Sequence, residues 1–355
     1  MVMLAEQYDF VIGGDPDRDT VDLAVLDTGA GRVRAHLADA ADGAGYRRML
    51  AWAGEQAPGR RIWALEGTGS FAAGLVVFLV DAGETVVEVG ALKRARGAKN
   101  DRIDAIRAAR QALSRDEHSA PRAGGLREAL RMVFACREGV LVSRTKAINE
   151  LKSLIVVAPE QLRAQLRGHS LTIQLARIEQ LQTPAAALVE HRLSVFSLQS
   201  IAARVRFLSA QLAELDPQLL DLIKQHPAGP TLLAEAGVGP VVAAQLLISW
   251  SHHGRVRNEA AFASLAGVAP LETSSGQRCR HRLNRGGDRA LNRALHTVAI
   301  TRMRCHPETR AYETRRTAEG KTHRDIRRSI KRALARRLYR KIEAAARLHD
   351  TSVVA

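Results

Sequence analysis

Short apolar runs separated by Asp and Gly turns fill the first ninety residues of the chain. Runs of this kind predict β-strands, and longer runs whose apolar positions recur every three or four residues predict helices. The strands fall at 8–14, 20–27, 32–38, 61–65 and 85–89, and the helices at 44–56, 70–82 and from Asp101 onward. Three strands followed by alternating helices and strands predict an α/β domain with a mixed sheet over residues 1–114.

The middle of the chain has a helical pattern. Apolar residues at helical spacing run through 121–157 and again through 184–225. Pro217 is expected to break or restart the second helix, with Asp216 as a candidate N-cap. A short heptad seam is formed there by Leu198, Ile201, Val205, Leu208, Leu212 and Leu215. The seam fits packing within the chain and an intermolecular coiled coil equally well, so residues 115–225 are predicted to be a helical connector with some bias towards dimerisation.

Residues 226–355 are predicted to form a helical domain. Gly237 and Gly239 stand between a short helix and the apolar helix 241–250. This pattern resembles a helix-hairpin-helix, whose backbone amides grip a phosphate without reading sequence. An ordinary tight turn between helices, with glycine supplying a positive φ, explains the same pattern. Two further helices are expected, at 288–304 and 322–348.

The chain is strongly basic, with 53 Lys and Arg against 37 Asp and Glu and a formal net charge of +16. Most of the excess lies in residues 270–355, where arginine far outnumbers lysine. Because guanidinium groups suit phosphate, this part is predicted to bind nucleic acid, although a basic surface that serves solubility has the same composition. Only 4% of the residues are aromatic, which argues against base stacking as the main mode of contact.

Cysteine usage and hydropathy argue against several classes of protein. Cys136, Cys279 and Cys305 are far apart and lack the spacing of zinc ligands. No apolar run reaches the length of a membrane span, and acidic residues near the start argue against a signal peptide. The expected location is the cytoplasm, in association with the nucleoid.

Four acidic residues are candidates for a metal site. Asp101 and Asp104 lie three apart on a predicted helix, so their carboxylates share one face and repel unless a cation lies between them. A solvated helix start explains this pair equally simply. Asp15 and Glu66 each follow a predicted strand, where the active sites of α/β sheets gather, and the four acids could hold two Mg²⁺ ions roughly 3.5 to 4 Å apart. Two other acids compete for the role of Asp15, namely Asp17 and Asp19.

A serine on a polar, glycine-containing loop is the candidate nucleophile. Ser274-Ser275-Gly276 is followed by four arginines, Arg278, Arg280, Arg282 and Arg285. A serine in this setting could attack a phosphate whose developing charge the guanidinium groups stabilise. The loop has no Gly-x-Ser-x-Gly elbow and no clear Asp and His partners for acyl transfer. A polar loop without a chemical role has the same pattern.

Together these features resemble one family, the DEDD transposases of bacterial insertion sequences in the IS-one-ten group. The resemblance extends from Asp15 to about Arg340. It is most specific in three stretches: Glu66-Gly67-Thr68-Gly69, Lys99 to Ala105, and Ala266 to Leu295. The third stretch contains A-G-V-A-P-x-x-x-S-S-G and R-G-G-D-x-x-L-x-x-A-L. The chain departs from the family at Gly14, where a bulky apolar residue usually precedes the first aspartate.

The resemblance implies a RuvC-like, ribonuclease-H-type fold in the first domain, with Asp15, Glu66, Asp101 and Asp104 binding Mg²⁺, or Mn²⁺ in its place. It implies a second, helical transposase domain in which Ser275, the serine directly before glycine, attacks DNA. It also implies guidance by a structured bridge RNA that the element encodes. Family members work as homodimers that pair into tetramers.

The predicted function is that of a DNA recombinase that cuts and rejoins DNA through a phosphoserine intermediate. Contacts to nucleic acid are expected from Arg278, Arg280, Arg282, Arg285, Arg289, Arg293, Gly237 and Gly239. One alternative is a RuvC-like junction nuclease that hydrolyses DNA with metal and water, while Ser275 merely lines its loop. The other is an inactive nucleic-acid-binding scaffold.

Overall fold

The computed structural model describes residues 4–90, 101–115, 118–122, 124–185, 187–272, 281–284 and 286–354 of the 355-residue chain. Only the backbone is described at Asp101, Glu272, 281–283 and 349–354. The chain forms two compact units, each assembled from separate stretches of sequence. The first comprises Met1–Arg127, Ser249–Asn292 and Lys321–Ala355, and the second comprises Glu128–Ile248 and Arg293–Gly320. The division at 114/115 and 225/226 stays a prediction.

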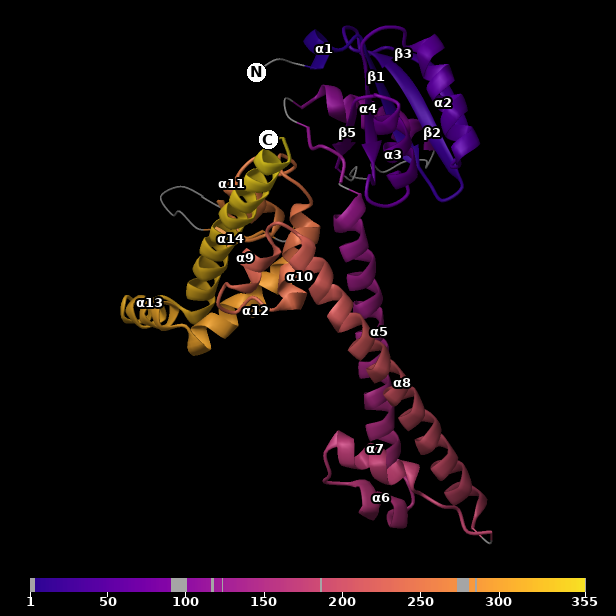
Figure 1. The fold of residues 1–355 in the computed structure, drawn as a ribbon, viewed down its shortest axis with the longest axis vertical. Helices are drawn as coiled ribbons and strands as arrows, with labels where there is room; N and C mark the ends of the chain where they lie inside the picture. The colour runs from indigo at the N-terminus through magenta and orange to yellow at the C-terminus, as the bar shows by residue number, and fades with distance from the viewer. Residues whose placement is uncertain are drawn as a thin grey trace. The chain divides into compact units, whose positions relative to one another are not determined.

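The first unit contains a five-stranded sheet (Figure 1). Its strands are β1 (Phe10–Pro16), β2 (Thr20–Asp27), β3 (Val33–Ala40), β4 (Arg61–Glu66) and β5 (Val86–Val89). They stand in the order β3-β2-β1-β4-β5. The first three strands are antiparallel to one another, whereas β1, β4 and β5 run parallel. This confirms the ribonuclease-H-like mixed sheet, and each strand lies close to the span predicted from its apolar run.

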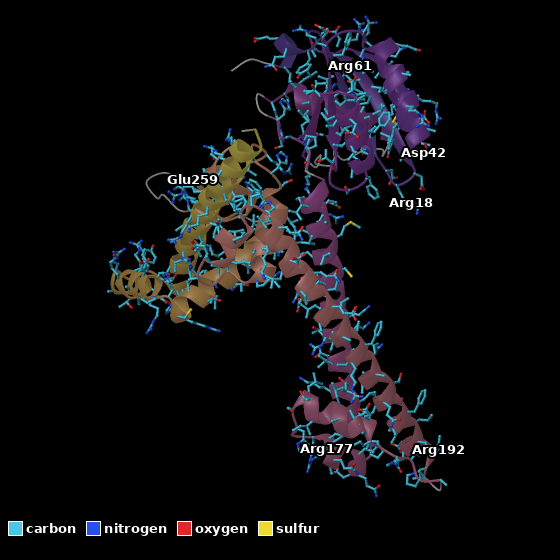
Figure 2. The ribbon with its side chains drawn as sticks, in the orientation of Figure 1. Arg18, Asp42, Arg61, Arg177, Arg192 and Glu259 are labelled. Carbon is cyan, nitrogen blue, oxygen red and sulfur yellow. The ribbon has the colours of Figure 1, made fainter. Side chains whose placement is uncertain are left out.

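Two helices cover one face of the sheet: α2 (Gly43–Gln56) and α3 (Ala73–Asp81). Asp42, labelled in Figure 2, begins α2 because its carboxylate accepts hydrogen bonds from two backbone amides of the first turn. Met49 of α2 and Leu75 of α3 are fully buried against this face. Larger aliphatic side chains therefore fill this layer of the core.

The opposite face of the sheet is covered by α4 (Asp101–Leu113), with α1 (Leu4–Gln7) beside it. The buried positions of α4 are all alanine, namely Ala105, Ala108, Ala109 and Ala112. Small side chains at a helical spacing let a helix approach the sheet closely. This close packing positions the acidic start of α4 next to the strands.

Two long helices, α5 (Gly125–Val157) and α8 (Val189–Gln225), run side by side in Figure 1. Arg144 of α5 donates a hydrogen bond of 2.7 Å to Ser209 of α8. Leu198 of the predicted heptad seam is buried in a core shared by α5, α8 and the two short helices α6 (Glu160–Leu166) and α7 (Leu171–Glu179). This end of the seam packs within the chain.

Pro217 does not break α8, contrary to the prediction from sequence. The helix continues through it as one element, and Leu219 and Ile223 beyond it are buried. A proline within a helix removes one hydrogen bond, and burial of the apolar residues that follow offsets this loss. Asp216 is not an N-cap, because it lies inside α8, and its carboxylate forms an ion pair with Arg137 of α5.

The remaining elements are α9 (Gly229–Leu233), α10 (Pro240–Trp250), α11 (Glu259–Leu265), β6 (Pro270–Glu272), β7 (His281–Leu283), α12 (Arg289–Cys305), α13 (Pro307–Ala318) and α14 (His323–Val354). The ring of Phe262 on α11 packs on that of Tyr339 on α14. Trp250 donates a 2.7 Å hydrogen bond to the buried carboxylate of Glu343. In the described part of the chain, no helix combines the length and apolarity needed to cross a bilayer.

Candidate active site

Asp15 and Glu66 lie at the carboxyl ends of neighbouring parallel strands. The paired stretch of β1 and β4 ends one residue before each acid. Because side chains alternate along a strand, Asp15 shares a face with Val11, and Glu66 shares a face with Ile62. Both apolar residues pack in the core beneath α4. The two partly buried carboxylates therefore belong to the α4 face of the sheet.

The close packing of α4 brings Asp104 to the same end of the sheet. A β carbon on Gly13 would stand 2.1 Å from the carbonyl oxygen of Ala105, so backbone meets backbone at this point. Asp104 directly precedes Ala105, and Asp15 lies two residues beyond Gly13. Arg107 donates a 2.6 Å hydrogen bond to Asp104 Oδ1 from the next turn of α4. Three of the four predicted acids thus lie at the same end of the sheet.

The side chain of Asp101 lies outside the described residues, but its backbone begins α4. Helical periodicity places positions 101 and 104 on one face. Among the side chains that are described, no group of three or more His, Cys, Asp or Glu is gathered closely enough to hold a metal ion. The donors at this end of the sheet are carboxylates, which suit Mg²⁺ or Mn²⁺ far better than softer metals. The available residues therefore fit a hard divalent cation.

One further carboxylate stands beside Asp15. Asp22 is its direct partner in the β1–β2 ladder, so both side chains lie on the α4 face. Sequence reasoning missed Asp22 because it lies inside a strand, where the only signal is an acid within an apolar run. On β3, burial and then the charge of Arg102 lower the pKa of His36 below its ordinary value of 6.5.

The two acids that compete with Asp15 lie in the turn between β1 and β2. Asp17 accepts a 2.8 Å hydrogen bond from the backbone amide of Arg18, and Asp19 forms an exposed ion pair with the same arginine, which Figure 2 labels. Both acids therefore act locally within the turn.

Gly14, the departure from the family pattern, has a steric explanation. A β carbon there would stand 2.5 Å from Leu65 Cδ2 and 3.1 Å from Leu23 Cδ2. These two buried leucines occupy the space that a bulky residue at position 14 would need. With glycine at position 14, β1 is continuous, and Asp15 lies within the strand.

The candidate nucleophile belongs to the loop between β6 and β7, which pair as an antiparallel hairpin. Ser275, Arg278 and Arg280 lie in the segment 273–280, outside the described residues, as does Arg285. Only the backbone of Arg282 is described, opposite Leu271.

The base of this hairpin is held by a hairpin clasp, formed by Leu265, Gly267, Gly287 and Asp288. Gly287 has φ +97°, and a β carbon on it would stand 2.4 Å from the carbonyl oxygen of Leu265. That same carbonyl accepts a 2.7 Å hydrogen bond from the amide of Asp288. The carboxylate of Asp288 caps α12 and accepts a 2.5 Å hydrogen bond from Ser249. Gly267 has φ +64°, and a β carbon on it would stand 2.9 Å from the carbonyl oxygen of Gly286, so Gly267 and Gly287 are both needed for backbone packing.

The other predicted nucleic-acid contacts differ in their surroundings. Arg289 and Arg293 are exposed on α12, and Arg293 lies 3.9 Å from Glu138. Gly237 has φ +81°, and its α carbon faces α12, because a β carbon would approach the carbonyl of Val298 to 3.3 Å. Gly239 has open space around it. A role in phosphate binding stays a prediction for all four residues.

Exposed arginines line α14 opposite its buried face, namely Arg324, Arg328, Arg332, Arg336, Arg337, Arg340 and Arg347. Glu259, labelled in Figure 2, forms ion pairs with Arg336 and Arg340. The helix nevertheless keeps a large excess of positive charge, which favours contact with a polyanion.

Two family models match the chain. Residues 12–158, which contain the carboxylate region, match a model for the DEDD transposases of IS110 elements, described as "Transposase". Residues 230–314, which contain the serine hairpin, match "Transposase IS116/IS110/IS902 family". The chain belongs to the IS110 family of transposases. This is the IS-one-ten group that the sequence motifs resemble, so that prediction is confirmed.

Two relatives from insertion elements are similar to this IS110-family chain. It is 36% identical over 125 residues to "Insertion element IS110 uncharacterized 43.6 kDa protein" of Streptomyces coelicolor, a match that covers 35% of the chain and 31% of that relative. It is 24% identical over 318 residues to "Insertion element IS900 uncharacterized 42 kDa protein" of Mycobacterium paratuberculosis, covering 75% of the chain and 78% of the relative.

Proposed function

We propose that this IS110-family protein is a DNA recombinase that moves its insertion element through a phosphoserine intermediate. One observation above all supports the proposal. Asp15 and Glu66 end parallel strands on the face that α4 covers, and Asp104 lies at the start of α4, so these three acids lie at the same end of the sheet, which supports metal-assisted phosphodiester chemistry. The hairpin clasp adds support, because it joins the segment that precedes β6 to the segment that follows β7, on either side of Ser275 in the sequence.

In the proposed reaction, the hydroxyl oxygen of Ser275 attacks a scissile phosphorus. A bond forms between phosphorus and the serine oxygen, and the bond to one deoxyribose oxygen breaks. The serine proton passes to a base or to solvent, and the departing deoxyribose oxygen takes up a proton. Attack on the phosphoserine by a deoxyribose hydroxyl of another strand then rejoins DNA and restores the serine hydroxyl.

Asp15, Glu66, Asp101 and Asp104 would hold two Mg²⁺ ions, or Mn²⁺, which when bound would polarise the phosphate oxygens. The arginines around the loop, Arg278, Arg280, Arg282 and Arg285, would hold the phosphate backbone near Ser275. The exposed arginines of α12 and α14 would extend this contact along DNA or along a bridge RNA. The working assembly would be a homodimer that pairs into a tetramer, acting in the cytoplasm at the nucleoid.

A denaturing gel tests the proposal directly. The purified protein is incubated with Mg²⁺, the element-encoded RNA and end-labelled junction DNA, as wild type, Ser275→Ala, Ser274→Ala and Asp15→Asn. We expect a covalent protein–DNA band in the wild type and in Ser274→Ala, and none in Ser275→Ala or Asp15→Asn. Cleaved DNA without an adduct, unchanged in Ser275→Ala, would instead indicate a hydrolytic junction nuclease. Binding of DNA and RNA without cleavage would indicate an inactive scaffold.

A further inference from the structure

A partly buried carboxylate on the far side of the sheet from the candidate metal ligands links several segments of the first unit. Glu88 lies on β5, directly opposite Leu65 in the β4–β5 ladder. It alternates with Val87 and Val89, which pack beneath α4, so its side chain lies on the other face. Glu88 is therefore an acid beside the active-site strand that does not join Asp15 and Glu66.

The contacts of this carboxylate define the Glu88 cluster, formed by Thr68, Glu88, Arg122 and Arg255. Thr68 Oγ1 donates a 2.6 Å hydrogen bond to Glu88 Oε2, and Arg255 Nη1 donates one of 2.7 Å to the same oxygen. Arg122 Nε stands 3.7 Å from Glu88 Oε1. The side chains of Glu88 and Arg255 are only 13% and 12% exposed, so water screens their attraction weakly.

The cluster fixes the turn that follows Glu66. Thr68, two residues beyond Glu66, is 2% exposed, and its hydroxyl also accepts a 3.3 Å hydrogen bond from the amide of Arg122. The backbone amide of Glu88 donates a 2.7 Å hydrogen bond to Ser119, and Arg255 donates one of 2.9 Å to Ala120. The turn after β4 is thereby joined to residues 119–122 and to the segment that leads into α11.

We infer that Glu88 is a positioning residue for Glu66: through Thr68 and Arg255 it holds the turn after β4, and so sets where the Glu66 carboxylate stands. The inference rests on the proposed function, since it assigns the Glu88 cluster a role towards the metal ligands. Outer partners that orient ligands commonly change metal affinity by about 10–100-fold when they are lost.

The first unit offers a matched control in Glu84. This carboxylate is 11% exposed and is paired with Arg61 (Figure 2) and with Trp63 Nε1, the latter at 2.8 Å. Glu84 thus resembles Glu88 in type, burial and partners. It lies at the amino ends of β4 and β5, the opposite end of the strands from Glu66.

The test measures Mn²⁺ binding by the full-length protein, from the electron paramagnetic resonance signal of free Mn²⁺, with a thermal melt of each variant. We expect Glu88→Gln and Thr68→Val to weaken Mn²⁺ binding by about tenfold, whereas Glu84→Gln and the conservative Thr68→Ser keep the wild-type affinity. Equal weakening by Glu84→Gln and Glu88→Gln, or no weakening by Glu88→Gln, would overturn the inference.

The wild-type arm separates this inference from the proposed function. A wild type that binds Mn²⁺ but forms no adduct with DNA would overturn the serine mechanism, and the comparison of Glu88→Gln with Glu84→Gln would still decide the positioning role. A wild type that binds no Mn²⁺ would overturn both.

Discussion

Gly13 of β1 and Ala105 of α4 touch through their backbones. A β carbon on Gly13 would stand 2.1 Å from the Ala105 carbonyl oxygen and 2.6 Å from the amide nitrogen of Ala109. Both opposing atoms belong to a helix backbone, so they cannot move aside as a flexible side chain would. The distance between β1 and α4, and hence between Asp15 and Asp104, depends on this glycine.

Gly13→Ala should therefore be strongly destabilising. Overpacking of this kind commonly costs about 1–3 kcal/mol, and a backbone clash belongs at the upper end. Urea unfolding followed by circular dichroism measures the change. Gly54→Ala, at an exposed site in α2 with open space around it, is the control and should be neutral or slightly stabilising. Equal free energies of unfolding for Gly13→Ala and Gly54→Ala would contradict the close packing of β1 against α4.

Asp104→Asn should separate stability from activity. Its partly exposed pair with Arg107 contributes only about 0.2–1 kcal/mol, so the melting temperature should barely change. Loss of one metal ligand should abolish adduct formation in the gel assay. Glu160→Gln, which breaks the Glu160–Arg163 pair at the same i,i+3 spacing on α6, should lose as little stability and keep full activity.

Gly287→Ala should damage the hairpin clasp. The substitution meets both a positive φ and the Leu265 carbonyl at 2.4 Å. Gly254→Ala meets only a positive φ of +83°, with open space around it, and this strain costs about 1–2 kcal/mol. We expect the larger loss of stability, together with loss of the protein–DNA adduct, in Gly287→Ala. Adduct formation at the wild-type rate by folded Gly287→Ala would show that the clasp does not position Ser275.

The second unit depends on a buried ion pair between Glu235 and Arg302. Their side chains are 4% and 6% exposed and are joined at 2.7 Å, and Arg302 also donates to the carbonyl of Ala236. Arg302→Met leaves the Glu235 charge buried without this partner, which should cost about 3–5 kcal/mol in chemical unfolding. Adding Glu235→Gln removes that charge and should restore part of the loss. A double variant less stable than Arg302→Met would refute this account.

The stability of the first unit should fall in acid through Glu84 and Glu88. Burial alone would raise the pKa of each, but hydrogen bonds from Arg61 and Trp63 to Glu84, and from Arg255 and Thr68 to Glu88, outweigh it and hold both below the ordinary 4.5. Charged carboxylates therefore stabilise the fold above pH 4.5, and this contribution is lost as the pH falls through the lowered values. The double variant Glu84→Gln/Glu88→Gln should lose less stability than the wild type between pH 5 and pH 3, within the range in which such groups titrate. An equal fall in the melting temperature of the wild type and of the double variant would contradict the assignment of this acid sensitivity to Glu84 and Glu88.

Local patterns in the sequence were sufficient for most elements of the fold. The strands from Phe10 to Val89 and the helices around them follow from apolar periodicity and turn residues, which act over a few neighbouring positions. The sequence did not predict the short helices α6, α7, α11 and α13 or the short strands β6 and β7. At Pro217 a local rule predicts a break, yet α8 continues. There the packing of Leu219 and Ile223, which sequence alone does not reveal, decides the outcome.

In the candidate site, too, some features follow from the sequence and others only from the tertiary structure. The sequence by itself predicted Asp15, Glu66, Asp101 and Asp104 as candidates, because strand ends and helical spacing are local properties. Three relations are seen only in the tertiary structure. Asp22 lies opposite Asp15, and Leu23 and Leu65 occupy the space beside Gly14. Glu88 pairs with Arg255, which lies 167 positions further along the chain. These relations depend on which segments the fold brings together, and pairing between distant residues leaves no periodic trace in the sequence.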